Sequence, residues 1–193
     1  MDLTEGTEEV KRNRAKKNIL WFGIISLTMS FAGLTSAYVV SKERPDWISN
    51  FEIPQAFYIS LALIIVSSFT MFFALRFIKK QKNALGMVFL ISTFLLGVLF
   101  VVFQFVGFSE IIESGYNFTG PTSSITTSFI YLVVLLHMAH VFAGLIALLV
   151  VIYNHYKLKY ENGKTLGVEL AATFWHFVDV VWIYLFLFLY FVK

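Results

Sequence analysis

The sequence contains no cysteine and few charged residues, and both shortages limit what the protein can be. Without cysteine there is no disulfide framework, no thiolate metal site and no cysteine nucleophile. Charged residues make up only 14% of the 193 residues, while hydrophobic residues make up 58%. A soluble domain contains about 25% charged residues, so this chain has too little polar surface to cover its own core. The composition predicts a membrane-embedded protein.

The motifs of several enzyme classes are also missing. The sequence has no Gly-rich phosphate loop, no nucleophile elbow and no pair of carboxylates inside an apolar segment. The pI near 9.0 is not a sign of nucleic-acid binding, because the basic residues flank apolar segments. Residues 1–18 are polar and precede an apolar stretch longer than the about 7–15 residues of a signal peptide. The first apolar segment is therefore predicted to be a retained helix.

What the sequence does have is five apolar segments, each long enough to cross a bilayer, which takes about 20 residues. They lie at residues 19–40, 54–77, 85–108, 126–153 and 170–192. The connections between them are too short to fold as separate domains. The predicted fold is all-α, an integral membrane bundle of five transmembrane helices. Residues 1–18 form a polar cytoplasmic segment, and residues 19–193 form a single transmembrane domain.

The basic residues predict the orientation of the bundle. Cytoplasmic loops of membrane proteins carry an excess of Lys and Arg. The outer side of this chain holds only Lys42, Arg44 and Lys193, beside Glu110 and Glu113. The other basic residues gather in the N-terminal segment, the second loop and the fourth loop: Lys11, Arg12, Arg14, Lys16, Lys17, Arg76, Lys79, Lys80, Lys82, Lys157, Lys159 and Lys164. The N-terminus is therefore predicted inside and the C-terminus outside.

A few polar side chains fall within the apolar segments, where an ionisable group costs about 2.5–3.5 kcal/mol unless it has a partner. They are Gln104 in the third segment, His137 and His140 in the fourth, and His176 and Asp179 in the fifth. Each pair in the fourth and fifth segments is spaced i, i+3 and shares one helix face. A rise of about 1.5 Å per residue places both pairs near mid-membrane.

The fourth and fifth helices are sequential and antiparallel, so their polar faces are predicted to meet in an Asp–His contact. Gly144, one turn beyond His140, would permit close approach of the two helices. Glu169 lies at the inner entrance of the fifth segment. Trp175 and Trp182 are expected to pack helices or to mark the membrane interface.

Three roles remain open for these polar residues. In the first role, they form interhelical hydrogen bonds that fix the packing, each worth about 0.6–2 kcal/mol. In the second, they handle protons or lipid headgroups. In the third, the histidines ligate a metal or haem. The first is favoured, because i, i+3 histidines on one helix are only weakly suggestive of ligation. Gln104 is expected to hydrogen-bond between helices.

Residues 169–182 of the fifth segment, Glu-Leu-Ala-Ala-Thr-Phe-Trp-His-Phe-Val-Asp-Val-Val-Trp, closely resemble the signature of subunit III of the haem–copper terminal oxidases, the cytochrome c oxidase family. His137-x-x-His140-x-x-x-Gly144 resembles the paired-histidine helix of that family. Gly97-x-x-Phe100-x-x-x-Gln104 is a further match, followed by Glu110. The similarity runs over almost the whole chain from Asn18, and the five helices resemble the shorter bacterial forms of the family.

Two departures from the family pattern stand out. Many relatives carry a carboxylate inside the helix that corresponds to residues 21–40, where this chain offers only serine and threonine as polar groups. Many relatives also place an acid three residues after the glutamine, where this chain has Gly107.

The resemblance implies a non-catalytic subunit of a proton-translocating oxidase of the respiratory chain in a bacterial inner membrane. Haem and copper would lie in partner subunits. This chain would pack on subunit I, beside subunit II and other subunits or a cytochrome supercomplex, bind phospholipid, and support proton uptake and stable turnover. Lys157 and Lys159 would meet lipid headgroups or only mark topology. The alternatives are a quinol oxidase, a nitric-oxide-reductase relative, or a stand-alone haem or metal protein using His137, His140 and His176.

Overall fold

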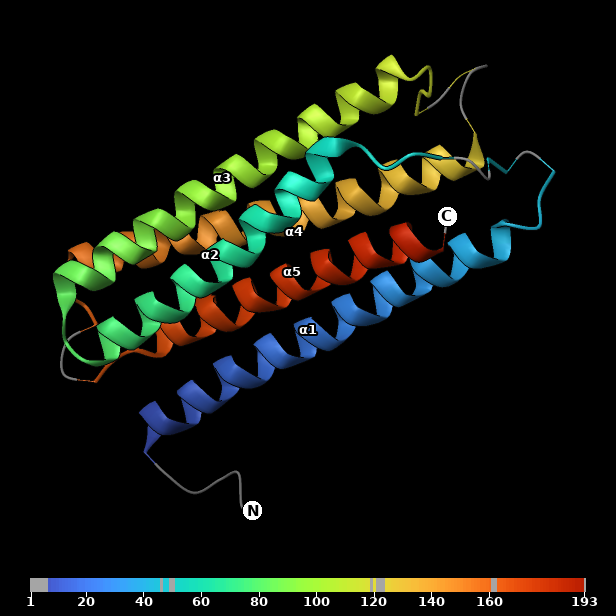
Figure 1. Cartoon of the computed structure of the whole chain (residues 1–193). Helices are drawn as coiled ribbons and strands as arrows, with labels where there is room; N and C mark the ends of the chain where they lie inside the picture. The colour runs from blue at the N-terminus through green and yellow to red at the C-terminus, as the bar shows by residue number, and fades with distance from the viewer. Residues whose placement is uncertain are drawn as a thin grey trace.

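A computed structural model of the chain describes residues 7–45, 47–48, 51–118, 120, 124–160 and 163–192. Within these ranges all regular secondary structure is helical (Figure 1). The helices are α1 (Glu8–Ser41), α2 (Gln55–Lys79), α3 (Asn83–Glu113), α4 (Ile125–Tyr156) and α5 (Leu166–Phe191). All five are long and apolar enough to cross a membrane. The predicted fold class, an all-α bundle of five spans, is confirmed.

The first helix begins much earlier than the apolar segment that predicts it. α1 starts at Glu8, so the described part of the polar segment 1–18 is almost wholly helical, while residues 1–6 and Lys193 lie outside the described ranges. Glu, Lys and Arg are good helix formers. The acidic residues Glu8 and Glu9 suit the positive end of the helix dipole, and Lys11 bridges back to Glu8 at 3.2 Å. A helix of 34 residues is about 51 Å long, longer than the hydrocarbon core of about 30 Å.

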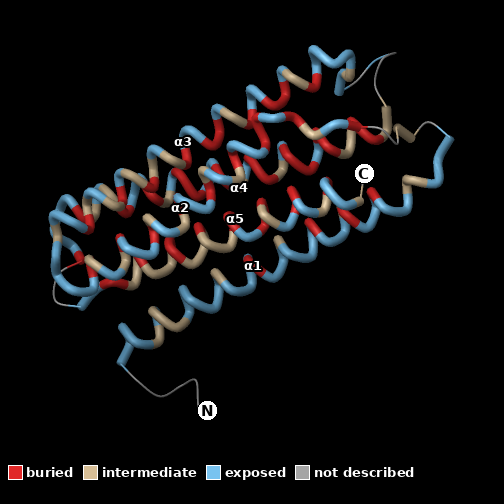
Figure 2. Tube along the Cα trace, in the orientation of Figure 1, coloured by how far each residue is buried: buried red, intermediate tan, exposed pale blue. Residues whose placement is uncertain are grey.

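The helices are packed unequally. α3 contacts α2 and α4, and α5 contacts α2 and α4, so these four helices enclose the core. Helix α1 lies at the edge of the bundle and touches only α4 and α5 in the described part of the chain (Figure 1). Figure 2 shows the buried residues on the facing sides of α2 to α5, whereas α1 is mostly exposed.

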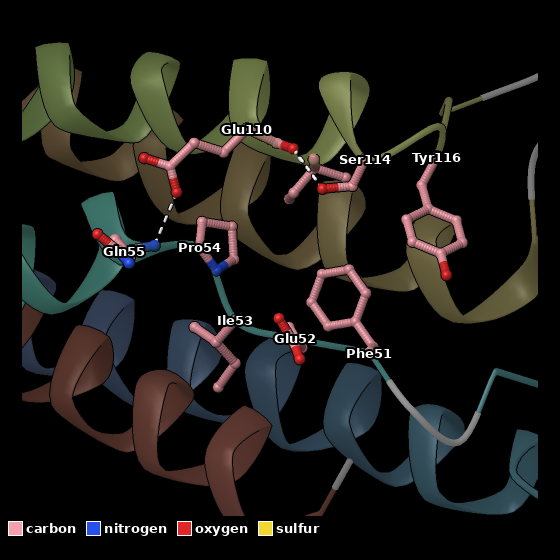
Figure 3. Close-up of a pocket in the computed structure, with 9 residues that line it drawn as sticks. Phe51, Glu52, Ile53, Pro54, Gln55, Glu110, Ser114 and Tyr116 are labelled. Carbon is pink, nitrogen blue, oxygen red and sulfur yellow. Dashed lines mark hydrogen bonds between the residues drawn. The ribbon is translucent and has the colours of Figure 1, made fainter.

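Side chains stabilise helix ends at the end of the bundle where α2 and α4 begin. The Oε2 atom of Glu110, near the end of α3, accepts a hydrogen bond of 2.7 Å from the backbone N–H of Gln55, the first residue of α2 (Figure 3). This bond satisfies one of the free N–H groups of a helix start. Ser124 forms a capping box with Thr127 at the start of α4. Glu110 therefore joins the start of α2 to the end of α3.

Candidate functional site

Trp175 joins four helices at the centre of the bundle. It lies on α5, is 1% exposed, and its indole N–H donates a hydrogen bond of 2.9 Å to the Ser67 hydroxyl of α2. Its ring lies against Gly97 of α3 and Gly144 of α4. A Cβ atom would lie 2.6 Å from the ring at Gly97 and 3.0 Å from it at Gly144. The two glycines thus form a slot for the indole, and Gly144 allows the close approach of α5 to α4.

A second aromatic layer surrounds His137. The imidazole is fully buried and stacks on Trp182 of α5, with ring centroids 5.1 Å apart and an angle of 25° between the planes. Phe100 of α3 meets both rings edge-on. Both nitrogens of His137 and the indole nitrogen of Trp182 lack a hydrogen-bond partner among the described residues. His137 therefore packs as an aromatic ring.

Gln104 connects α3 to α2. Its side chain is fully buried, and its Nε2 donates a hydrogen bond of 2.9 Å to the Ser60 hydroxyl. One turn away, the ring of Phe57 occupies the space where a Cβ atom of Gly107 would project. A larger side chain at position 107 has no room beside this ring, so the packing of α3 on α2 requires glycine there.

The other two histidines face different neighbours. His140 places Nδ1 2.7 Å from the Leu136 carbonyl oxygen of its own helix and packs against Phe31 of α1. His176 places Nδ1 2.7 Å from the Ser68 hydroxyl of α2. Phe31 also meets the ring of His137, whereas His176 lies against α2. Among the described residues, no three His, Asp or Glu side chains gather into a group that could hold a metal ion.

The predicted Asp–His hydrogen bond between α4 and α5 is wrong. Asp179 is 1% exposed, and neither carboxylate oxygen has a hydrogen-bond partner within the described ranges. The Ser68 hydroxyl of α2, which also contacts His176, is a polar group beside it. The two polar faces do not meet, because indole rings occupy the space between α4 and α5 and turn His176 and Asp179 toward α2.

Glu169 joins three helices at the end of the bundle where α5 begins. Its Oε1 lies 2.9 Å from the Lys79 ammonium of α2, and its Oε2 lies 3.6 Å from that of Lys17 of α1. Thr165, just before α5, donates a hydrogen bond of 3.1 Å to Oε1. The side chain is 29% exposed, so the ion pairs are partly shielded from solvent.

Sequence reasoning missed the hydroxyl partners on α2. Ser60, Ser67 and Ser68 receive or make the polar contacts of Gln104, Trp175 and His176. A usable signal exists, because Ser60 and Ser67 are seven residues apart and so lie on one face of an apolar helix.

Two adjoining hollows lie beside α1 and α5 in the half of the bundle where α5 begins, and α4 also lines the first of them. One holds about 370 Å³ and is lined mainly by apolar side chains, among them Leu20, Ala147 and Phe174. The other holds about 290 Å³, is polar, and includes Lys16 and Lys164 together with the acidic Glu9. Gly167 and Leu170 line both hollows.

Tyr160, in the connection before α5, closes one end of the apolar hollow. A Cβ atom added at Gly167 would lie 2.8 Å from the Tyr160 hydroxyl oxygen. Burial raises the pKa of the Tyr160 hydroxyl, because the phenolate would lose its hydration, while a hydrogen bond with Asn154 acts in the opposite direction. The group is neutral at physiological pH and adds no charge to the hollow.

Residues 16–193 match the protein family described as cytochrome c oxidase subunit III. Cytochrome bo(3) ubiquinol oxidase subunit 3 of Buchnera aphidicola subsp. Baizongia pistaciae is 33% identical over 190 residues, 94% of this chain and 95% of that protein. Cytochrome c oxidase subunit 3 of Corynebacterium diphtheriae is 32% identical over 177 residues, 86% and 82% of the two chains. Probable quinol oxidase subunit 3 of Staphylococcus aureus is 33% identical over 174 residues, 86% and 83%. The chain belongs to the cytochrome c oxidase subunit III family.

Proposed function

We propose that this chain is the non-catalytic subunit III of a proton-translocating haem–copper oxidase, which packs on subunit I, binds phospholipid and supports proton uptake and stable turnover. The observation that carries the proposal is that the motif residues pack the helices against one another. Gly97, Gly144 and Trp175 lock the helices together around one indole ring. Residues that characterise the family thus serve helix packing, as expected of a subunit that supports a partner holding the haem and copper.

The proposed location is the cytoplasmic membrane of a bacterium, with the N-terminus inside. Basic side chains support this orientation, because the inner ends of α1 and α2 carry Lys16, Lys17, Arg76, Lys79 and Lys80. The helical N-terminal extension of α1 then reaches beyond the hydrocarbon on the cytoplasmic side. The charged side chains of this extension would be costly inside the bilayer.

Phospholipid binding is supported by the two adjoining hollows. At the inner membrane boundary, Lys16 and Lys164 line a polar hollow at headgroup level, where each basic residue is worth about 1 kcal/mol toward anionic lipid. The apolar hollow that continues from it has room for part of an acyl chain. Lys157 lies over the Tyr153 ring, and Lys159 donates a hydrogen bond to Asn154, so these two are better explained as topology markers.

The proposed electron donor is cytochrome c, and quinol is the second candidate. The relatives named above include a cytochrome c oxidase subunit as well as quinol oxidase subunits at similar identity. The donor docks on other subunits, so the residues of this chain do not separate the two. A nitric-oxide-reductase-associated role is a further alternative within the family, which the partner subunits of the complex would identify.

The first test is purification of the tagged chain in mild detergent, with a reduced-minus-oxidised visible spectrum and mass spectrometry of the co-purifying proteins. Haem bands together with large oxidase subunits are the expected result, and the identity of those subunits gives the donor. A chain that purifies alone and still carries haem or metal would overturn the proposal.

A second test separates packing from proton handling. Asp179→Ala is expected to reduce the yield of assembled complex more than it alters the haem spectrum or turnover of the complex that does assemble. The reason is that Asp179 is enclosed by helices α2 and α5 and lines no hollow described above. Loss of turnover in a fully assembled, lipid-replete variant would argue for direct proton handling by Asp179.

A further inference from the structure

One side of α5 remains uncovered between its two flanking helices. α1 and α2 both contact α5 but do not contact each other in the described part of the chain, and α5 runs between them in Figure 1. His176 faces α2 through Ser68, and Tyr184 faces α1 through a hydrogen bond of 2.9 Å with Thr35. At about 100° per residue, these two side chains point about 80° apart, and Val180 points midway between them.

We call this uncovered side the α5 strip; it consists of Thr173, His176, Val180 and Leu187. Val180 is 61% exposed and Leu187 is 44% exposed. At the inner end, Glu169 bridges Lys17 of α1 and Lys79 of α2 on the same side of α5. The strip therefore begins at a cluster of ion pairs and continues as a mainly apolar surface.

His176 makes the α5 strip unusual for a surface that faces lipid. It is half-buried, and it lies about 15 Å from the inner end of α5, near the middle of a hydrocarbon core of about 30 Å. Nδ1 is occupied by Ser68. Nε2 makes no hydrogen bond to any described residue, and it is not among the buried unpaired atoms, so it lies at the surface.

The surroundings of His176 add a second unpaired group. Behind it, one turn along α5, the buried carboxylate of Asp179 also lacks a hydrogen-bond partner in the described ranges. Acyl chains offer no hydrogen bonds at this depth, and lipid headgroups lie too far away. Polar side chains within the membrane face protein partners or water-filled cavities instead.

We propose that the α5 strip is the docking surface for a transmembrane helix of a neighbouring oxidase subunit, which offers a hydrogen-bonding group to His176 Nε2 at mid-membrane depth. This inference rests on the proposed function as an oxidase subunit, and it names the surface through which the subunits meet. The apolar side chains of the strip supply the packing contact, while His176 fixes the register of the incoming helix.

The test is photo-crosslinking in the intact complex. A benzophenone amino acid replaces Val180, and in a matched control it replaces Val102, which is 49% exposed on α3 and equally far from the outer end of its helix. Val180 is expected to give an adduct with one large oxidase subunit, and Val102 is expected to give none. An adduct of Val180 with lipid alone, or with a second copy of this chain, would overturn the inference.

The photo-crosslinking result and the proposed function can fail independently. The proposed function fails if the unmodified chain does not co-purify with oxidase subunits.

A complementary measurement compares His176→Ala with His176→Asn, which retains hydrogen-bonding capacity. His176→Ala is expected to weaken retention of the partner in mild detergent by roughly threefold, as for one interhelical hydrogen bond, with part of the loss recovered in His176→Asn. Equal retention in both variants and in the unmodified chain would contradict a role for Nε2.

Discussion

Helices α1 and α5 are neighbours, but they are held in the bundle in different ways. The 34 residues of α1 place four side chains in the core, whereas the 26 residues of α5 place eleven there. α5 carries two fully buried tryptophans and packs against three other helices. α1 exposes its single tryptophan, Trp21, and has small or hydroxyl-bearing residues along much of its outer side.

The difference indicates what constrains each helix. In α5 the residue at position 175 is fixed by volume, because its indole ring must match the slot formed by Gly97 and Gly144 on the facing helices. In α1 the backbone is open at Gly23 and Gly33, where an added Cβ atom would meet nothing within 4 Å. Substitutions that test internal packing should therefore have large effects around α5 and small effects along α1.

The largest effect is expected from Trp175→Ala. Removal of a buried aromatic side chain costs about 3–5 kcal/mol, and here it also leaves the Ser67 hydroxyl without its indole donor. The free energy of unfolding of the full-length chain, measured by SDS titration in mixed micelles, should fall by about that amount. Trp21→Ala on α1, where the side chain is 56% exposed, is the matched control. A similar loss in both variants would refute the contrast between the helices.

The next effect concerns the glycine slot. Gly97→Ala should destabilise the chain by about 1–3 kcal/mol, the usual cost of overpacking, because the new Cβ atom would lie 2.6 Å from the Trp175 ring. Gly33→Ala on α1 should be neutral or slightly stabilising, because alanine is the better helix former by about 1 kcal/mol. The same SDS titration measures both. Stabilisation by Gly97→Ala would show that the slot is wider than the structure indicates.

The helices also show which features of the fold the sequence alone predicts. Hydropathy predicts the five spans, because burial in hydrocarbon acts on average composition. It does not predict where α1 begins, because charged residues such as Glu8 and Lys11 continue a helix outside the membrane as readily as apolar ones. The start of a helix depends on propensity and capping, and hydropathy measures neither.

For the polar residues within the helices, too, the sequence predicts one part of the structure and misses another. Spacing identifies His137, His176 and Asp179 as unusual residues within the membrane. The prediction that they pair across α4 and α5 is wrong, because side-chain volume decides the contact. The rings of Trp175 and Trp182 fill the space between helices, and the actual partner of His176 is Ser68 on α2. Such partners depend on the rotation of each helix, which periodicity in an almost uniformly apolar segment leaves undetermined.

A smaller effect is expected where α1 is attached to α5, toward the C-terminal ends of both helices. Thr35 shares a hydrogen bond of 2.9 Å with Tyr184, whereas the hydroxyl of Thr28, also on α1, bonds only to the Ile24 carbonyl of its own helix. Thr35→Val should lower the free energy of unfolding by about 0.6 kcal/mol more than Thr28→Val does, the average for one interhelical hydrogen bond in a membrane. Equal values for the two variants would mean that the Tyr184 bond adds nothing to the attachment of α1.

The smallest effect should come from the N-terminal part of α1, where its attachment depends on charge. Lys17 lies 3.6 Å from Glu169 and is 52% exposed, whereas Lys79 of α2 lies 2.9 Å from the same carboxylate. Exposed ion pairs contribute about 0–1 kcal/mol and weaken with salt, so Lys17→Met should cost less than Lys79→Met. Double-mutant cycles of each with Glu169→Gln, by SDS titration at low and high salt, isolate the pair energies. A Lys17–Glu169 coupling energy larger than the Lys79–Glu169 coupling energy would mean that α1 is attached to α5 chiefly at its charged end. The contrast between a packed α5 and a loosely held α1 would then apply only to the hydrocarbon region.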